Sequence, residues 1–361
     1  MPGRDGASGT VLLVGGYGVV GSQIAAAVHR RHPELPLTIA GRNAEKVARA
    51  AETFAAEALA LDVSRPEPLA GLRPRAVVSV VNDPGDHLLA DAMRLGVPLL
   101  DIARWTDRVR CAAALVVAAA PTAPVLLSSG WMAGICSTIA AGVASELHRV
   151  ETIDISVLYA LEDKAGPDSA EYMDRLAAPF EVTTGGRPAR ARPLGDGRRV
   201  AFPDGGCARV YRFDTPDQLT LPATTGAATV AARIGFDSAL TTSLLVALVR
   251  SGAWRLVSGE RFTALRRKLL YNPGPGAGHQ VLIEVAGHDI RGRSVKARAG
   301  VSDPLGQTHL TAVATLVQLE RLLGLDGAPS PDSGLVYPDT SPQLTAALDV
   351  LTRFGIEVSL S

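Results

Sequence analysis

The stretch Thr10-Val-Leu-Leu-Val-Gly-Gly-Tyr-Gly-Val-Val-Gly-Ser-Gln-Ile24 decides the fold of this chain. Its apolar run, Val11 to Val14, is typical of a parallel strand that is buried on both faces. Gly16, Gly18 and Gly21 follow in G-x-G-x-x-G spacing, and a sequence with high helix propensity comes next. A strand, a glycine-rich turn and a helix in this order predict a dinucleotide-binding site.

Each glycine of the motif has an expected mechanical role. Gly16 should form the tight turn, Gly18 should let the pyrophosphate approach the backbone, and Gly21 should let the helix pack closely on the strand. The unpaired N–H groups at the start of the helix should receive the phosphates. Glycines also serve strand-to-helix turns for structural reasons alone, which is the alternative explanation of the motif.

Length and composition favour a globular protein of two domains. The chain has 361 residues, of which 47% are hydrophobic and 20% charged, and its formal net charge is zero. A neutral chain gives no electrostatic reason to expect nucleic acid or a membrane as a partner. Its three cysteines are far apart and lack C-x-x-C spacing, which predicts reduced thiols, no metal site and a cytoplasmic location. The N-terminus has no apolar signal segment.

Strands and helices are expected to alternate through the first domain. After the glycine motif, a helix is predicted over residues 44–58, and further helices over 88–95 and 107–119. Alternation of this kind predicts an α/β fold, here an N-terminal Rossmann domain with a doubly wound parallel sheet. The predicted strands that follow the first one span residues 37–40, 59–63, 76–81, 97–102 and 124–127.

The ends of these strands should carry the rest of the cofactor site. The second strand ends in Ala40-Gly-Arg42 and offers no acidic residue to a ribose 2′-hydroxyl. Because an arginine can fork onto a 2′-phosphate, Arg42 favours NADP over NAD, although a solvated arginine in a turn is the alternative. Asp62 and Val63 should lie beside the adenine, unless Asp62 only caps its turn. The loop that begins at Asn82 should lie along the cofactor.

The pattern changes near residue 151 to strands with polar and apolar residues in alternation. This predicts a second, α+β domain built on a mostly antiparallel sheet, with a hairpin of strands 280–286 and 294–299 and a helix over 310–323. The expected boundaries are 1–127 for the NADP-binding domain and 128–330 for the substrate and dimerisation domain. Residues 331–361 should supply a last helix and strand that rejoin the first domain.

Candidates for proton transfer are few and individually weak. Hydride transfer needs mainly positioning, with one group that donates or accepts a proton. Asp101 should lie at the correct edge of the first sheet, but an aspartate at a strand end often has a structural role. Loop residues that could face a cleft are Tyr159, Lys164, Tyr172 and His279, and for each of them a surface or packing role is the alternative.

Several motifs of the first domain together resemble the saccharopine dehydrogenase-like (saccharopine reductase) oxidoreductases. They are Val14-Gly-Gly-Tyr-Gly-Val-Val-Gly21, Ala40-Gly-Arg-Asn43, Leu61-Asp-Val63, Val81-Asn-Asp-Pro84 and Gly96-Val-Pro-Leu-Leu-Asp101. The later chain matches more loosely. The family often has a Gly-Glu pair shortly after the aspartate, where this chain has Ala103-Arg104, and a Pro-Gly turn where this chain has Met132-Ala-Gly134.

The resemblance implies roles for particular residues. Arg42 and Asn43 would hold the 2′-phosphate, Asp62 and Val63 would lie on the adenine side, and Asn82 on the nicotinamide-ribose side. The diphosphate would be held by the glycine turn, which comprises Gly16, Tyr17, Gly18, Val19, Val20 and Gly21.

The expected function is that of an NADPH-dependent oxidoreductase, active as a homodimer on a small molecule. Its reaction would be the reduction of an imine, or the reductive joining of an amine to a carbonyl compound, in specialised biosynthesis. Two alternatives are a C=C or C=O reductase of the same fold and a redox sensor that binds NADP without turnover.

Overall fold

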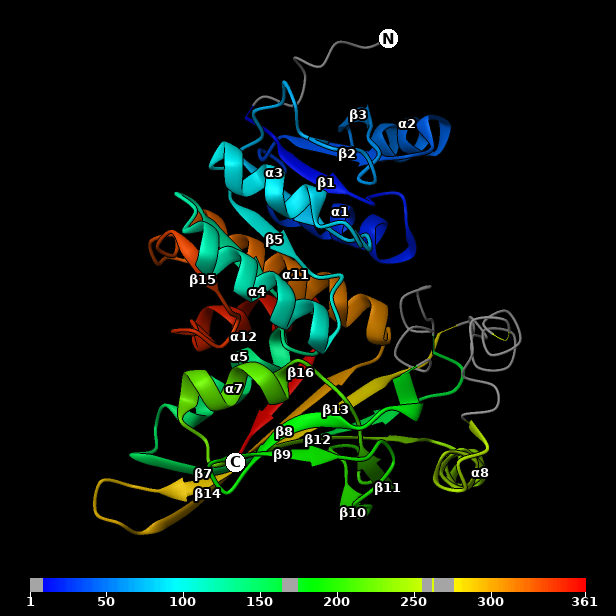
Figure 1. Cartoon of the computed structure of the whole chain (residues 1–361), viewed down its shortest axis with the longest axis vertical. Coiled ribbons are helices and arrows are strands. Elements are labelled where there is room, and N and C mark those ends of the chain that lie inside the picture. Colours follow the sequence, from blue (N-terminus) through cyan, green and yellow to red (C-terminus); the bar gives the residue numbers. More distant parts are fainter. Residues whose placement is uncertain (1–8, 164–174, 255–261, 263–275) are drawn as a thin grey trace. The chain divides into compact units, whose positions relative to one another are not determined.

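The protein divides into two compact units, each with its own sheet. The first unit comprises residues 1–134 and 311–338, and the second comprises residues 135–310 and 339–361. The computed structural model describes residues 9–163, 175–254, 262 and 276–361 of the chain (Figure 1). The expected boundary at residue 127 therefore lies seven residues too early, since the first unit continues to Gly134.

A seven-stranded parallel sheet forms the first unit. Its order is β15-β6-β5-β4-β1-β2-β3, so β1 lies between β2 and β4 and the chain reverses its direction of winding there. This is the predicted doubly wound Rossmann sheet, extended by one strand from the C-terminal part of the chain. The strands are β1 (Val11–Val14), β2 (Leu37–Gly41), β3 (Glu57–Ala60), β4 (Ala76–Ser79), β5 (Leu99–Asp101), β6 (Pro124–Leu127) and β15 (Gly334–Val336).

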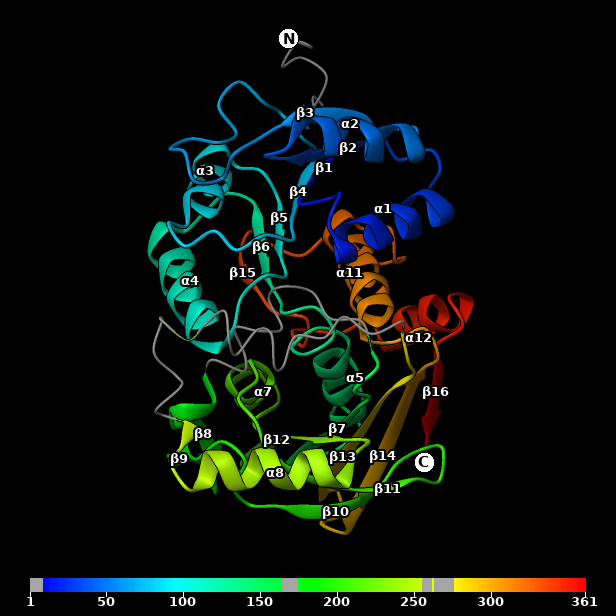
Figure 2. The ribbon, with the colours of Figure 1, turned by 90° about the vertical axis from the view of Figure 1, so that its right-hand side faces the viewer.

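Helices lie on both faces of this sheet. Figure 2 shows α3 (His87–Leu95) and α4 (Thr106–Ala119) on one face, and α1 (Val19–Arg31) with α11 (Gln307–Leu323) on the other. Every residue of β1 and β4 is buried, which agrees with the apolar run of β1 and the apolar and small residues of β4. Residues 311–323 of α11 belong to this unit, which differs from the expectation that this helix lies wholly in the second domain.

The helix predicted over residues 44–58 is too long. Helix α2 (Ala44–Thr53) ends before Phe54, and Ala55 takes a left-handed conformation with φ at +49°. The chain then turns into β3 at Glu57, so the third strand begins two residues before its predicted start at Leu59. The alanine-rich sequence favours helix throughout, and pairing of β3 with β2 overrides that local preference.

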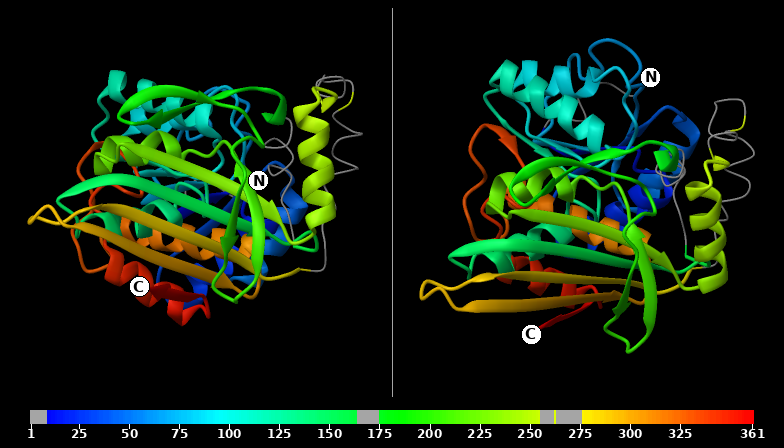
Figure 3. Two further views of the ribbon diagram at one scale, coloured as in Figure 1. Left: turned by 90° about the horizontal axis from the view of Figure 1, so that it is seen from below. Right: turned by 60° about the horizontal axis from the view of Figure 1, so that its bottom comes forward.

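The second unit is built on a mostly antiparallel sheet, as predicted. Its order is β10-β11-β12-β7-β13-β14-β16, and only the β12–β7 pair is parallel. Figure 3 shows the long β13–β14 hairpin in yellow to orange, with β16 in red beside it. The strands are β7 (Arg149–Tyr159), β10 (Arg198–Ala201), β11 (Cys207–Arg212), β12 (Thr229–Phe236), β13 (His279–His288), β14 (Ser294–Asp303) and β16 (Glu357–Leu360), with a separate hairpin of β8 (Phe180–Thr184) and β9 (Arg187–Ala191).

Helices cover the apolar face of this sheet. Helix α5 (Ile135–Ala144) packs on β7, β13 and β14, and α7 (Asp217–Thr225) packs on β12. The face below them carries Ile153, Ile155 and Val157, which are 3% exposed or less. The remaining elements are α8 (Ala239–Arg250), the short 3-10 helix η2 (Arg175–Ala177) and α12 (Leu344–Arg353), which contacts α5 and β16.

The last helix and strand do not rejoin the first domain as predicted. Only β15 joins the first sheet, where it pairs with β6. Strand β16 pairs with β14 at the edge of the second sheet, through four residues from Glu357 to Leu360. The expectation for residues 339–361 was therefore wrong, because their partner strand is set by a pairing that the local sequence does not reveal.

Candidate functional site

The strand order of the first sheet indicates which of its edges should bind a ligand. In an open parallel sheet, ligands bind outside the carboxyl ends of the strands where the winding reverses. Here the reversal lies between β1 and β4, the two strands paired from Val11–Ala76 to Val14–Ser79. The loops that leave these two strands, and those that leave β2 and β5 beside them, form the candidate dinucleotide site.

The turn after β1 is made by four consecutive residues from Gly15 to Gly18. Gly15 has φ at +92°, a left-handed conformation that favours glycine, and the Gly18 amide donates to the Gly15 carbonyl at 3.0 Å. The sequence assigned the tight turn to Gly16, but the left-handed residue is Gly15. Gly16 is pressed against side chains instead, since a β carbon there would lie 2.9 Å from Ile39 Cγ2.

Helix α1 starts directly after this turn. Gly18 is its N-cap, contributes no capping side chain, and no acidic residue stands in the first turn. A β carbon on Gly21 would lie 2.2 Å from the Gly15 oxygen, so the helix can approach the turn only with glycine at position 21. The first N–H groups of α1 are thus left without a side-chain cap or a nearby carboxylate of their own turn, which suits an anionic ligand.

The other residues of the glycine turn link it to β2. Tyr17 lies so close to Gly41 that a β carbon on Gly41 would meet Tyr17 Cε1 at 2.3 Å. Val19 is 45% exposed at the start of α1, and Val20 is half-buried. The Tyr17 ring, in the turn after β1, therefore packs against Gly41 at the end of β2.

Arg42 and Asn43 follow β2 and differ in their surroundings. Arg42 is exposed, and Asn43 is the N-cap of α2, where its Oδ1 accepts from the Lys46 amide at 3.0 Å. Asp62 Oδ1 accepts from the amide and the hydroxyl of Ser64, and these bonds hold the pKa of Asp62 below its usual value. The charge of Arg42 adds to that lowering, so Arg42 and Asp62 share one electrostatic neighbourhood.

Val63 and Asn82 lie in the loops after β3 and β4. The Val63 carbonyl contacts His87 Nδ1 at 3.3 Å, which ties the loop after β3 to the start of α3. Asn82 is partly exposed in the loop after β4, and the next residue, Asp83, is buried and caps α3 by accepting from the Leu88 amide at 2.8 Å. The first turn of α3 is thus bonded both to the loop after β3 and to the loop after β4.

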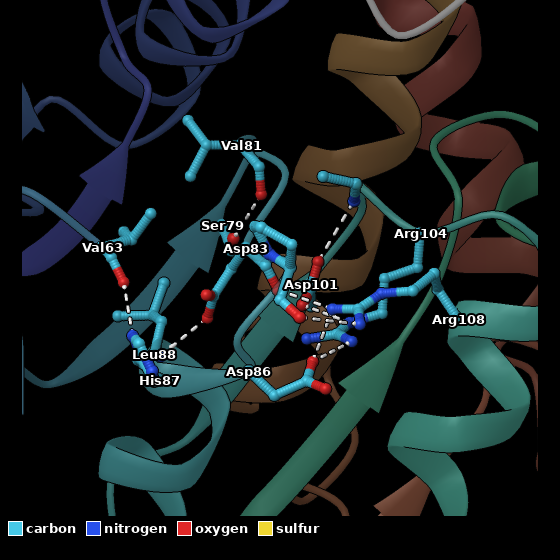
Figure 4. A network of polar contacts seen from close by, with 12 residues as sticks. Val63, Ser79, Val81, Asp83, Asp86, His87, Leu88, Asp101, Arg104 and Arg108 are labelled. Carbon is cyan, nitrogen blue, oxygen red and sulfur yellow. Dashed lines mark hydrogen bonds and ion pairs between the residues drawn. The ribbon is translucent and has the colours of Figure 1, made fainter. Parts of the chain in front are cut away.

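Asp101 ends β5, and both of its carboxylate oxygens are engaged. Oδ1 accepts from the Ala103 amide at 3.1 Å, and Oδ2 accepts from Arg104 Nε at 2.6 Å (Figure 4). The Asp101 side chain is only 4% exposed. Asp101 is therefore ion-paired with Arg104, and each of its carboxylate oxygens accepts a hydrogen bond.

Arg104 continues from Asp101 into a chain of alternating charges. Its Nη1 donates to Asp86 Oδ1 at 2.6 Å, and Arg108 Nη2 donates to the same oxygen at 2.7 Å. Burial lowers the pKa of Arg104, but the carboxylates of Asp101 and Asp86 outweigh it and the net shift is upward. The sequence analysis noted Arg104 only as a departure from the family pattern, and it did not single out Asp86 or Arg108.

A second polar cluster lies in the second unit, at the end of β7. Tyr159 Oη accepts from Gln307 Nε2 at 2.5 Å, and the Gln307 amide donates to Asp163 Oδ2 at 2.9 Å. His279 is fully buried, lies 3.7 Å from Asp163 Oδ2 through Nδ1, and packs edge-on against the Tyr159 ring. Burial lowers the pKa of His279 to about 3. The structure thus brings together two residues that the sequence proposed, Tyr159 and His279.

Two other candidates, Lys164 and Tyr172, lie outside the described residues. Within the described part of the chain, no group of three or more His, Cys, Asp or Glu side chains is arranged to hold a metal ion. Among the same residues, no helix is both long and apolar enough to cross a membrane.

The two sheets and the glycine turn define a two-domain protein whose first unit has a Rossmann fold. No family model and no curated protein matches the chain. Among solved structures, it is similar to the saccharopine dehydrogenase (L-Glu forming) of Saccharomyces cerevisiae, with a TM-score of 0.68, 14% sequence identity and coverage of 98% of this chain and 99% of that one. The chain therefore has a saccharopine dehydrogenase-like fold, as its motifs predicted.

Two other solved structures are similar to the chain only more distantly. A myo-inositol dehydrogenase from Corynebacterium glutamicum has a TM-score of 0.44 and 15% identity, with 98% of each chain covered. An oxidoreductase from Agrobacterium radiobacter, in complex with NAD⁺, L-tartaric acid and magnesium, has a TM-score of 0.43 and 12% identity, covering 96% of this chain and 93% of that one. These two likenesses are too distant to bear on function.

Proposed function

We propose that the protein is an oxidoreductase that uses a nicotinamide dinucleotide. The observation that carries the proposal is the glycine turn at the reversal of the sheet, where Gly15 is left-handed and Gly21 lets α1 begin beside it. The first turn of α1 has neither a capping side chain nor an acidic residue, so a diphosphate fits there. When bound, the dinucleotide would supply or accept a hydride.

NADP is the proposed form of the cofactor. The segment after β2 reads Gly41-Arg-Asn43, and the exposed Arg42 can fork onto a 2′-phosphate where an acidic residue would repel it. Asp62 is close enough to Arg42 for their charges to interact, and it would restrain the arginine on the adenine side. Asn43 would contribute through the capped first turn of α2, because its side-chain oxygen is already used as the N-cap.

The cofactor proposal is tested by titrating NADPH and NADH into the wild type and into Arg42→Ala. Loss of a charge-assisted phosphate contact should weaken NADPH binding by about 1.5 to 3 kcal/mol and leave NADH nearly unchanged. Arg49→Ala is the matched control, since Arg49 is also exposed and pairs with Glu45 within α2. Equal affinity of the wild type for the two cofactors would refute the NADP assignment.

The proposed reaction is the reduction of an imine, or the reductive joining of an amine to a carbonyl compound. Among the described residues, Tyr159 is the preferred proton donor, because a phenol can donate a proton and Gln307 holds its oxygen in place by a hydrogen bond. Asp101 is less suited, since a backbone amide and Arg104 occupy its two oxygens. Lys164 and Tyr172 remain candidates from the sequence alone.

Tyr159→Phe tests the proposed donor. Removal of the hydroxyl should lower kcat about 100-fold or more while NADPH affinity stays unchanged. A turnover assay with NADPH and a panel of imines, ketones and activated alkenes separates an imine reductase from a C=O or C=C reductase. Tight NADPH binding without turnover of any class would favour the redox-sensor alternative instead.

A further inference from the structure

The loop between β4 and α3, residues 80–86, is held by side chains that come from another part of the chain. Arg108 Nη2 donates to the Asp83 carbonyl at 2.5 Å, and its Nη1 donates to the Pro84 carbonyl at 3.1 Å. The same guanidinium reaches Asp86 Oδ1, which also accepts from Arg104. Two arginines that follow β5 therefore bind this loop: Arg108 binds its backbone, and both arginines bind the side chain of its last residue, Asp86 (Figure 4).

The loop that these arginines bind contains a residue with an unfavourable backbone conformation. Asp86 has φ at +54°, a left-handed conformation that costs a residue with a β carbon about 1 kcal/mol or more. It stands directly before α3 but gives that helix no side-chain cap, because its carboxylate points to the two arginines. The Asp86 side chain is thus used to hold the loop and not to start the helix.

Arg104 joins Asp86 of this loop to Asp101 at the end of β5. Its guanidinium is 3% exposed and bridges Asp101 Oδ2 and Asp86 Oδ1, both at 2.6 Å. Asp101 is fixed in turn by the Ala103 amide at the end of β5. The loop after β4 is therefore linked to the end of the neighbouring strand β5 through the buried Arg104–Asp101 ion pair.

The loop lies where the strand order requires a cofactor to pass. It leaves β4 beside β1, at the reversal of the sheet, on the side away from β2 and Arg42. If the adenosine end of the dinucleotide lies toward β2, its nicotinamide end lies toward β4 and β5.

We propose that Arg104 and Arg108 are positioning residues that hold the β4–α3 loop in the form that receives the nicotinamide-ribose end of the cofactor. The inference rests on the proposed function and assigns a role that the glycine turn and Arg42 do not cover. Neither arginine needs to touch the cofactor. Their effect reaches it through the backbone of residues 82–85, which Asp86 and the carbonyls of Asp83 and Pro84 hold in place.

The test compares a whole cofactor with its adenosine half. Binding of NADPH and of 2′,5′-ADP is measured by isothermal titration calorimetry for the wild type, Arg108→Gln and Arg108→Lys. Arg108 is chosen because its side chain is 19% exposed, whereas that of Arg104 is 3% exposed, so that its replacement is expected to destabilise the fold. Arg110→Gln is the matched control on the same helix, since Arg110 is 43% exposed and pairs with Asp107.

Arg108→Gln should weaken NADPH about tenfold, which corresponds to about 1.4 kcal/mol, and leave 2′,5′-ADP binding within about twofold of the wild type. Arg108→Lys should give a smaller loss, because a lysine keeps the charge without the planar fork. Arg110→Gln should match the wild type for both ligands.

Two results would overturn the inference. Unchanged NADPH binding by Arg108→Gln would show that the hydrogen bonds from Arg108 to the loop have no effect on the cofactor. An equal loss of both ligands would show a general structural role. A wild type that binds neither NADPH nor NADH refutes the proposed function itself, and one that prefers NADH is tested in the same way with NADH and ADP.

Discussion

Gly21 packs directly against the carbonyl of Gly15, so that a β carbon at position 21 would lie 2.2 Å from that oxygen. Gly21→Ala must therefore push α1 away from the turn after β1. We expect a loss of about 1 to 3 kcal/mol in the free energy of unfolding, measured by urea denaturation, together with weaker NADPH binding.

Gly18→Ala separates these two effects. Gly18 has φ at −74°, which any residue adopts, and a β carbon there would lie 3.2 Å from the Gly15 oxygen. We expect the free energy of unfolding to change by less than about 1 kcal/mol while NADPH binding weakens, since the added methyl would stand where the phosphates approach. Equal losses of stability in the two variants would contradict this distinction.

Glu320 is a buried carboxylate that joins α11 to the end of α1. It accepts from Arg31 Nε at 2.9 Å and lies 2.7 Å from His32 Nε2, with only 2% of its side chain exposed. Glu320→Ala should lower the free energy of unfolding by about 2 to 4 kcal/mol, because it leaves the two basic side chains without their buried partner. The control is Glu34→Ala, since Glu34 also faces His32 but is 74% exposed and should contribute almost nothing.

Asp339 should make stability depend on pH in an unusual direction. Burial raises its pKa from 3.8 to about 6, against the opposing effect of its bond from Thr224 Oγ1. A carboxyl whose pKa is higher in the folded state binds a proton more tightly there, so its stabilising effect is present below pH 4 and is lost as the pH rises toward 6.

Asp339→Asn removes this titration and keeps an oxygen for Thr224. The difference in unfolding free energy between wild type and variant should change by about 2 to 3 kcal/mol between pH 4 and pH 6.5. The charge of Asp217 adds to the raised pKa of Asp339. A difference that stays constant over this pH range would rule out a raised pKa.

The three thiols should react in two classes. Cys111 and Cys207 are exposed, whereas Cys136 is buried in α5, where burial raises its thiol pKa well above the usual value and the charge of Asp217 raises it further. Ellman's reagent should therefore titrate two thiols in the native protein and the third only on unfolding. Reaction of all three at one rate in the native state would show that α5 opens readily.

The parts of the fold that depend on local burial could be predicted from the sequence. The run Val11–Val14 is the strand β1 with the predicted bounds, because a strand buried on both faces must be apolar throughout. The switch to an antiparallel sheet was also predictable, since β7 alternates between a polar face and the buried Ile153, Ile155 and Val157.

Features that depend on distant partners could not be predicted in this way. Residues 54–58 have the composition of a helix, and only the pairing of β3 with β2 shows that the helix ends. For the site, the spacing of the motif directed attention to Gly16, whereas the backbone places the left-handed turn one residue earlier. Arg104 looks like any arginine in the sequence until its 3% exposure and two carboxylate partners are known.

The seventh strand of the first sheet has a consequence for how the chain can be made and divided. A fragment that ends at Gly134 would lack β15 and α11, leaving β6 as an open edge and one of the two helices on the α1 face of the sheet missing (Figure 2). During translation the same surfaces stay incomplete until residue 338 has left the ribosome. The first unit is therefore expected to complete its fold only after residue 338 has been synthesised, and its isolated N-terminal segment should aggregate when expressed alone.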